Sequence, residues 1–218
     1  MKTADDTSRL LGMIQQGEHA TQDFKFEISD CRKIARSISA FANTDGGRLL
    51  IGVKDNGHIA GIRSEEEIYM IEAAAKMYCT PGQQPDMEIL TSENKKVLIA
   101  TISKAETPPV CAIDENKRPM AYVRIKDENI LASAVRMAVW EQERAKEGHM
   151  VRLLETESTL IGMADSGRMF TLNEFAIKAS ISRRKAIKTL ACFIRYGIIE
   201  EVFENHRFYF RKSRKDRP

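Results

Sequence analysis

Residues 39–62, SAFANTDGGRLLIGVKDNGHIAGI, constrain the fold of this chain more than any other part of its sequence. The first four of these residues are small or apolar, which is typical of the end of a helix. Residues 43–47 then break the helix, because Asn and Gly tolerate the positive φ that turns the chain. The apolar run 49–53 lies between two turn signals, which predicts a strand buried on both faces.

A tight turn is predicted after this strand. The pair Asn56-Gly57 is the strongest short-range hairpin signal, so residues 58–62 are predicted to return as a neighbouring strand. Gly52 and Gly61 lie inside the two predicted strands. A glycine inside a strand marks a bulge or the close approach of another group.

This order of elements resembles the AlbA_2 (Schlafen-type) domain, whose core signature is a helix, FANTDGG, an apolar strand, GV-x-D-x-G and x-I-x-G. The matching residues here are Phe41 to Gly47, Gly52, Val53, Asp55, Gly57, Gly61 and Ile62. An upstream family motif is matched in spacing by Glu18, Asp23, Phe24 and Lys25, with Asp23 in place of the usual Glu and His19 in place of the usual Ser. The resemblance implies a nucleic-acid-binding module.

The remaining pattern alternates helices and strands. A helix with Ile34, Ile38 and Phe41 on one face is predicted to begin after Ser29 as its N-cap. Three strands are predicted over residues 87–90, 97–102 and 120–125, and a helix over residues 129–146. Together these predict an α/β (α+β) fold with a mixed sheet. The expected domains are an AlbA_2-like domain over 1–146, a linker or helix over 147–167, and a third segment over 168–218.

The last segment resembles a winged helix-turn-helix domain of bacterial transcription regulators. Thr171 and Ser182 are predicted N-caps of helices over 172–178 and 183–196. Residues 198–202 and 207–210 are predicted to form a hairpin after them.

Charge is unevenly distributed along the chain. The net charge is +3 overall, but residues 168–218 carry 13 Lys/Arg and 5 Asp/Glu. A basic module on an acidic body is typical of nucleic-acid binding, although a basic surface can also be merely solvated. The predicted nucleic-acid contacts are Lys25, Ser182, Arg183, Arg184, Lys185, Lys188, Arg207, Arg211 and Lys212. Many winged helices mediate only protein contacts, and that alternative stays open.

Three acidic residues form the one candidate catalytic group. RNA-cleaving Schlafen-type domains carry three carboxylates at positions similar to Glu18, Asp23 and Asp55. Converging carboxylates are hard oxygen ligands for Mg²⁺ or Mn²⁺, which activate water. In this hypothesis Lys25 neutralises a phosphate. The alternative is structural: Asp55 caps its turn, while Glu18 and Asp23 are solvated at a strand edge.

Composition and motifs argue against several other classes of protein: membrane, secreted, zinc-binding and disulfide-rich proteins, and nucleotide-binding proteins of the P-loop or Rossmann type. No apolar run approaches the roughly 20 residues of a membrane span, and the N-terminus carries two aspartates and lacks the apolar core of a signal peptide. The four cysteines are far apart without a CxxC spacing, so neither zinc nor a disulfide framework is predicted and a cytoplasmic protein is expected. No GxxxxGK[ST] or GxGxxG motif is present.

Three functions follow in order of preference. The first is a DNA-binding transcriptional regulator without catalytic activity or cofactor, expected to be a homodimer because such proteins bind paired half-sites. The second is a metal-dependent endoribonuclease that uses Glu18, Asp23 and Asp55. The third is a non-enzymatic interaction scaffold.

Overall fold

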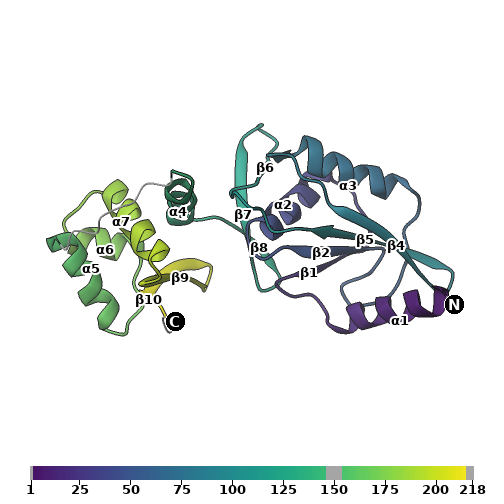
Figure 1. The fold of residues 1–218 in the computed structure, drawn as a ribbon, viewed down its shortest axis with the longest axis horizontal. Helices are drawn as coiled ribbons and strands as arrows, with labels where there is room; N and C mark the ends of the chain where they lie inside the picture. The colour runs from purple at the N-terminus through teal and green to yellow at the C-terminus, as the bar shows by residue number, and fades with distance from the viewer. Residues whose placement is uncertain (1, 146–153, 215–218) are drawn as a thin grey trace. The chain divides into compact units, whose positions relative to one another are not determined.

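The structure of the protein is a computed structural model that describes residues 2–145 and 154–214. The chain forms two compact units, which divide after Ala132. The two units are labelled by element in Figure 1. Within the described ranges, no helix combines the length and the apolar character needed to cross a lipid bilayer.

Three helices and two four-stranded sheets make up the first unit. The helices are α1 (Lys2–Gln15), α2 (Cys31–Ala42) and α3 (Glu66–Met77). The first sheet has the order β1-β2-β5-β4, with β1 Gln22–Lys25, β2 Gly47–Ile51, β5 Lys95–Ile102 and β4 Asp86–Ser92. The second has the order β3-β6-β7-β8, with β3 Cys79–Thr80, β6 Cys111–Ile113, β7 Pro119–Ile125 and β8 Glu128–Leu131.

The central strand β2 organises the first sheet. It runs parallel to β1 and antiparallel to β5, so the predicted mixed sheet is confirmed. Leu49, Leu50 and Ile51 are fully buried, which confirms a strand covered on both faces. Leu50 packs with Leu10 of α1, whereas Leu49 and Ile51 join the core beneath α2 and α3 on the opposite face (Figure 1).

The predicted return strand over residues 58–62 was wrong. Residues 54–58 do form a turn, but beyond it only an isolated bridge joins Val53 to Ile59. The neighbour of β2 on that side is β5, a strand from much later in the chain. Gly52 diverts the chain, because its φ is +95° and its carbonyl oxygen accepts hydrogen bonds from both Ala60 N and Gly61 N. A Cβ on Gly52 would lie 2.8 Å from the Gly61 carbonyl carbon, so the predicted close approach is confirmed.

Two predicted helix starts also differ from the structure. The N-cap of α2 is Asp30 and not Ser29, since the Asp30 carboxylate accepts a hydrogen bond from Arg32 N at 2.8 Å. The helix predicted over residues 129–146 begins later, because β7 and β8 form a hairpin closed by Lys126 at φ +56°. Ser133 then caps the following helix with its hydroxyl, which accepts from the backbone N of the third helical residue.

The signature loop, residues 41–47, fastens the end of α2 to the second sheet. The Asn43 amide donates to the carbonyl oxygens of Val110 (2.7 Å) and Tyr122 (2.9 Å), and its Oδ1 accepts from Val110 N at 2.7 Å. The Thr44 hydroxyl accepts from Arg124 N at 2.9 Å. Much of this family signature is therefore structural.

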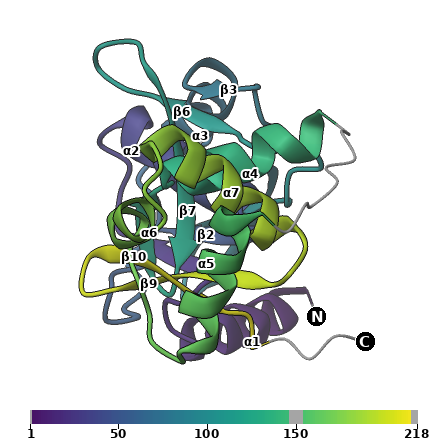
Figure 2. The same cartoon turned by 90° about the vertical axis from the view of Figure 1, so that its left-hand side faces the viewer.

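Over its described residues, the second unit contains four helices and a hairpin, seen from another side in Figure 2. Their bounds are α4 Ala134–Arg144, α5 Glu155–Asp165, α6 Leu172–Lys178, α7 Arg183–Arg195, β9 Ile199–Glu204 and β10 Arg207–Lys212. Phe175, Leu190, Phe193 and Phe210 form its centre. The predicted order of helix, turn, helix and hairpin is confirmed, with Thr171 and Ser182 as N-caps. The linker predicted over 147–167 lies partly outside the described residues, and its described part holds α5.

The hydrogen bonds of the Asn43 side chain predict a large loss of stability in Asn43→Ala. Three hydrogen bonds to the backbone of Val110 and Tyr122 are lost, although the Val110 carbonyl keeps its bond from the Ser39 hydroxyl, so the free energy of unfolding measured with urea falls by about 2–4 kcal/mol. Asn116→Ala, in an exposed turn of the same unit, is the control and changes it by less than about 0.5 kcal/mol. Equal losses in the two variants contradict the structural role of the signature loop.

Candidate nucleic-acid interface

Asp23, predicted as a metal ligand, is buried in an ion pair. Its Oδ1 lies 3.2 Å from Nη2 of Arg124, whose side chain is 1% exposed. Its Oδ2 lies 2.6 Å from Nζ of Lys25, and that Nζ also donates to the Phe24 carbonyl oxygen at 2.8 Å. The Lys25 charge is therefore already engaged within the first unit, so its predicted contact with a phosphate competes with this pair.

The buried Arg124 connects several elements. Its Nη1 donates to Oδ1 of Asn129 at 2.9 Å, and its Nη2 also donates to the Gln22 carbonyl oxygen at 3.3 Å. The guanidinium carbon lies 5.0 Å from the centre of the Phe41 ring. These contacts join β1, α2 and β8 to β7, which indicates a structural role for the Asp23–Arg124 pair.

Glu18 lies beside Asp23, whereas Asp55 lies apart in an exposed turn. Oε1 of Glu18 accepts from Phe24 N at 3.0 Å. Burial raises the pKa of the Glu18 carboxyl, and the neighbouring Asp23 raises it further. Over the ranges 2–145 and 154–214, no three His, Cys, Asp or Glu side chains are grouped to hold a metal ion. Hydrolysis by Glu18, Asp23 and Asp55 stays a prediction, and the described residues assemble no metal site for it.

The predicted basic surface at the start of α7 is exposed. The Ser182 hydroxyl accepts a hydrogen bond from Lys185 N at 3.3 Å, which confirms that Ser182 is the N-cap of α7. The side chains of Arg183, Arg184, Lys185 and Lys188 are all exposed. Nη1 of Arg183 donates to Oδ1 of Asn173 on α6 at 2.5 Å, a neutral partner. In the part of the chain that the structure describes, no carboxylate pairs with any of these four cations.

The cations of the hairpin differ from those of α7. Nε of Arg211 lies 2.6 Å from Oε1 of Glu200, and Nζ of Lys212 lies 2.7 Å from Oδ1 of Asp165. Arg207, at the start of β10, is exposed and forms no ion pair with a described carboxylate. The structure therefore separates the predicted nucleic-acid contacts of this unit into open and neutralised cations.

The family model for the Schlafen AlbA_2 domain matches residues 18–133, just over half of the chain. The chain belongs to the Schlafen AlbA_2 family. The match ends within one residue of the division between the two units, so helices α4 to α7 and the hairpin lie beyond the AlbA_2 domain.

Two solved structures are similar to the chain. The DIP2311 protein from Corynebacterium diphtheriae is 20% identical with a TM-score of 0.46, and the match covers 78% of this chain and 31% of that one. The second is the N-terminal domain of a candidate ATP-dependent DNA helicase RecG-related protein from Nitrosomonas europaea. It is 17% identical to this chain, with a TM-score of 0.40. That match covers 67% of this chain and 94% of the domain. The chain thus spans less than a third of DIP2311. No curated protein sequence matches it significantly.

Sequence patterns missed the residues that hold the AlbA_2 signature in place. Arg124 lies in a strand of mostly apolar and aromatic residues, MAYVRI, and this isolated charge was the available signal of a buried pair. Its partner Asp23 is 101 residues away in the chain, so no local spacing connects them.

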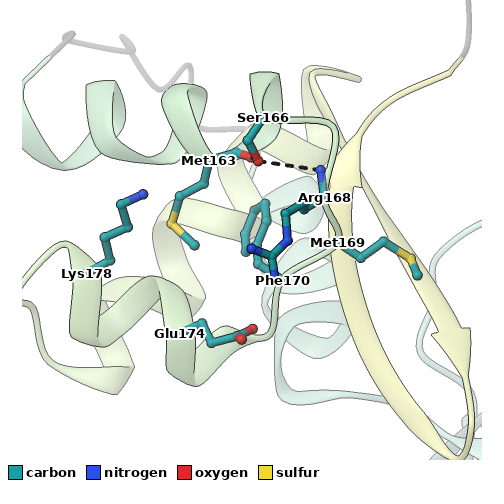
Figure 3. A pocket seen from close by; sticks show the side chains of 7 residues that line it. All are labelled: Met163, Ser166, Arg168, Met169, Phe170, Glu174 and Lys178. Carbon is teal, nitrogen blue, oxygen red and sulfur yellow. Dashed lines mark hydrogen bonds between the residues drawn. The ribbon is translucent and has the colours of Figure 1, made fainter.

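A small cavity lies in the second unit beside α6 (Figure 3). Its volume is about 180 Å³, and Arg168, Glu174 and Lys178 line it together with Met163, Met169 and Phe170. Glu174 belongs to the capping box of α6, in which its carboxylate accepts from Thr171 N at 2.6 Å. That hydrogen bond lowers the pKa of Glu174. The cavity is smaller than the roughly 300–1,000 Å³ typical of sites for small molecules.

The buried pair predicts that Asp23→Ala destabilises the protein. Removing the carboxylate leaves the Arg124 guanidinium buried without its anion, which costs about 3–5 kcal/mol of unfolding free energy in urea titrations. The double variant Asp23→Ala/Arg124→Met removes both charges and recovers most of this loss.

The exposed Asp55→Ala is the matched control and leaves stability within about 0.5 kcal/mol of the unmodified protein. A stable Asp23→Ala variant would contradict the structural role of Asp23 and would favour the view that its carboxylate is free to bind a ligand.

Proposed function

We propose that this protein binds DNA through its second unit, which acts as a winged helix-turn-helix with α7 as the recognition helix. The observation that carries the proposal is the group of open cations at the start of α7. A charge without a protein partner remains available to displace counterions from the phosphate backbone, which strengthens binding at low salt.

The order of elements supports a winged helix. Just before α6, Phe170 forms an isolated bridge with Phe210 of β10. A turn of four residues joins α6 to α7, and the β9–β10 hairpin follows α7. Two helices joined by a short turn are the helix-turn-helix motif, whose second helix enters the major groove with its N-terminal residues at the base edges.

The cations at the start of α7 fit this mode of docking. Arg184 and Lys188 are four residues apart and so lie on the same side of the helix. Arg183 is oriented by Asn173, and a planar guanidinium can bind guanine with two hydrogen bonds. We assign phosphate contact in the hairpin to Arg207, which has no carboxylate partner among the described residues, and not to Arg211, which is paired with the half-buried Glu200.

We further propose a transcriptional regulator that acts as a homodimer. Helix-turn-helix proteins bind two half-sites about one helical turn apart, and a two-fold dimer matches that symmetry. In this proposal the first domain is the AlbA_2 domain and the second extends from Ser133 to the hairpin, because α4 packs on α7.

The paired variant Arg184→Gln/Lys188→Gln tests this assignment in the full chain. Affinity for a labelled 20-base-pair duplex, measured by fluorescence anisotropy at 100 mM salt, is expected to fall at least about tenfold. The slope of log affinity against log salt becomes shallower by about 1.8, which corresponds to two lost phosphate contacts.

The control is Arg211→Gln, which removes a charge that is already paired with the half-buried Glu200. Its affinity is expected to stay within about threefold of the unmodified protein. Equal losses in both variants would show that only net charge matters, and no loss in the first would exclude α7. A structured RNA tested alongside, with and without Mn²⁺, shows whether the protein prefers RNA or cleaves it.

A further inference from the structure

A polar groove lies in the first unit at the end of the signature loop. Its volume is about 450 Å³, and its lining includes Gln16, His19, Thr21, Arg48, Lys104 and residues 45–47. Ile102 is the one apolar side chain among the residues that line it. A lining of this kind favours a charged or strongly polar ligand over an apolar one.

Arg48 is held in this groove by two amide side chains, of which the buried Gln22 is fixed in place. Gln22 is fully buried, and its Nε2 donates to the carbonyl oxygens of Met13 and Gly17, both at 2.7 Å. These two bonds orient Oε1 of Gln22 toward Arg48, whose Nε donates to it at 2.6 Å. Nη2 of Arg48 donates to Oε1 of Gln16 at 2.7 Å.

The charge of Arg48 has no anionic partner among the described residues. Both of its side-chain partners are neutral amides, and no described carboxylate lies within ion-pair distance. Burial, together with repulsion from Arg9, lowers the pKa of the Arg48 guanidinium. A half-buried cation in these surroundings gains stability when an anion binds beside it.

Two further groups add hydrogen-bond donors to the groove. Nδ1 of His19 accepts from Thr21 N at 3.2 Å, so in the neutral ring the proton is carried by Nε2, which is a donor. Nζ of Lys104 lies 3.1 Å from Oδ1 of Asp45, and both side chains are well exposed. An exposed pair of this kind is weak, so Lys104 can turn to a stronger anion.

We propose that this groove binds a phosphate group, with Arg48 as the principal contact and His19 and Lys104 as additional donors. The phosphate belongs either to a free nucleotide or to a nucleic-acid backbone, which present the same oxygen acceptors. Arg48 pairs in register with Gln22, and Asp23 pairs with Leu49. Because neighbouring residues of a strand point to opposite faces, Arg48 lies on the opposite face of the sheet from Asp23.

Calorimetric titration of the full chain tests the proposal. The probes are AMP and a 12-nucleotide single-stranded DNA, and all proteins carry Arg184→Gln/Lys188→Gln so that the contribution of α7 is reduced. In this background Arg48→Gln is expected to weaken binding at least about tenfold. The control Arg63→Gln removes the same charge from an exposed arginine of the same unit and changes binding less than about twofold.

Binding of AMP that depends on Arg48 supports a free-nucleotide ligand, and binding of the oligonucleotide alone supports a nucleic-acid backbone. The proposal is overturned if neither probe binds, or if Arg48→Gln and Arg63→Gln behave alike. Thermal melting monitors the fold of each variant. Should Arg48→Gln unfold the protein, the exposed Lys104→Gln takes its place, with a threefold or greater loss expected and an unchanged affinity counting against the site.

Discussion

The ion pair between Asp23 and Arg124 is the contact on which the architecture of the AlbA_2 domain depends. It is buried on both sides and joins the edge strand β1 to the second sheet. The Phe41 ring packs against the guanidinium, while Asn43 and Thr44 bind the backbone of the same sheet. Because a buried charge is costly without its partner, this arrangement fixes how the two sheets meet across α2.

Local signals predicted the parts of the fold that depend on neighbouring residues. The caps Thr171 and Ser182, the helix between them and the hairpin after Gly197 were predicted correctly, because capping and turn formation involve residues a few positions apart. The partner of β2 was predicted wrongly, since Asn56-Gly57 forms a turn but the neighbouring strand β5 comes from distant sequence. The roles of Asp23 and Arg48 were hidden for the same reason, because their partners lie on other elements.

Ion pairs in the structure distinguish basic residues that cannot be told apart in the sequence. Arg184 and Arg211 both belong to the basic C-terminal segment, yet Arg211 lies against Glu200 while Arg184 is open to solvent. The same distinction sets Arg48 apart from Lys25 in the first unit. Cations without a protein anion are the ones available to phosphate, which is why we propose nucleic-acid contact at the start of α7 and a separate phosphate site in the AlbA_2 domain.

The most direct test of nucleic-acid binding by α7 is a set of NMR spectra of the full chain as a 20-base-pair duplex is added. If α7 binds DNA, the amide and side-chain signals of residues 182–188 and of Arg207 shift, while those of Arg211, which is paired with Glu200, change little. Spectra in which α7 stays unchanged while other surfaces respond, or in which the duplex has no effect, would contradict DNA binding by α7.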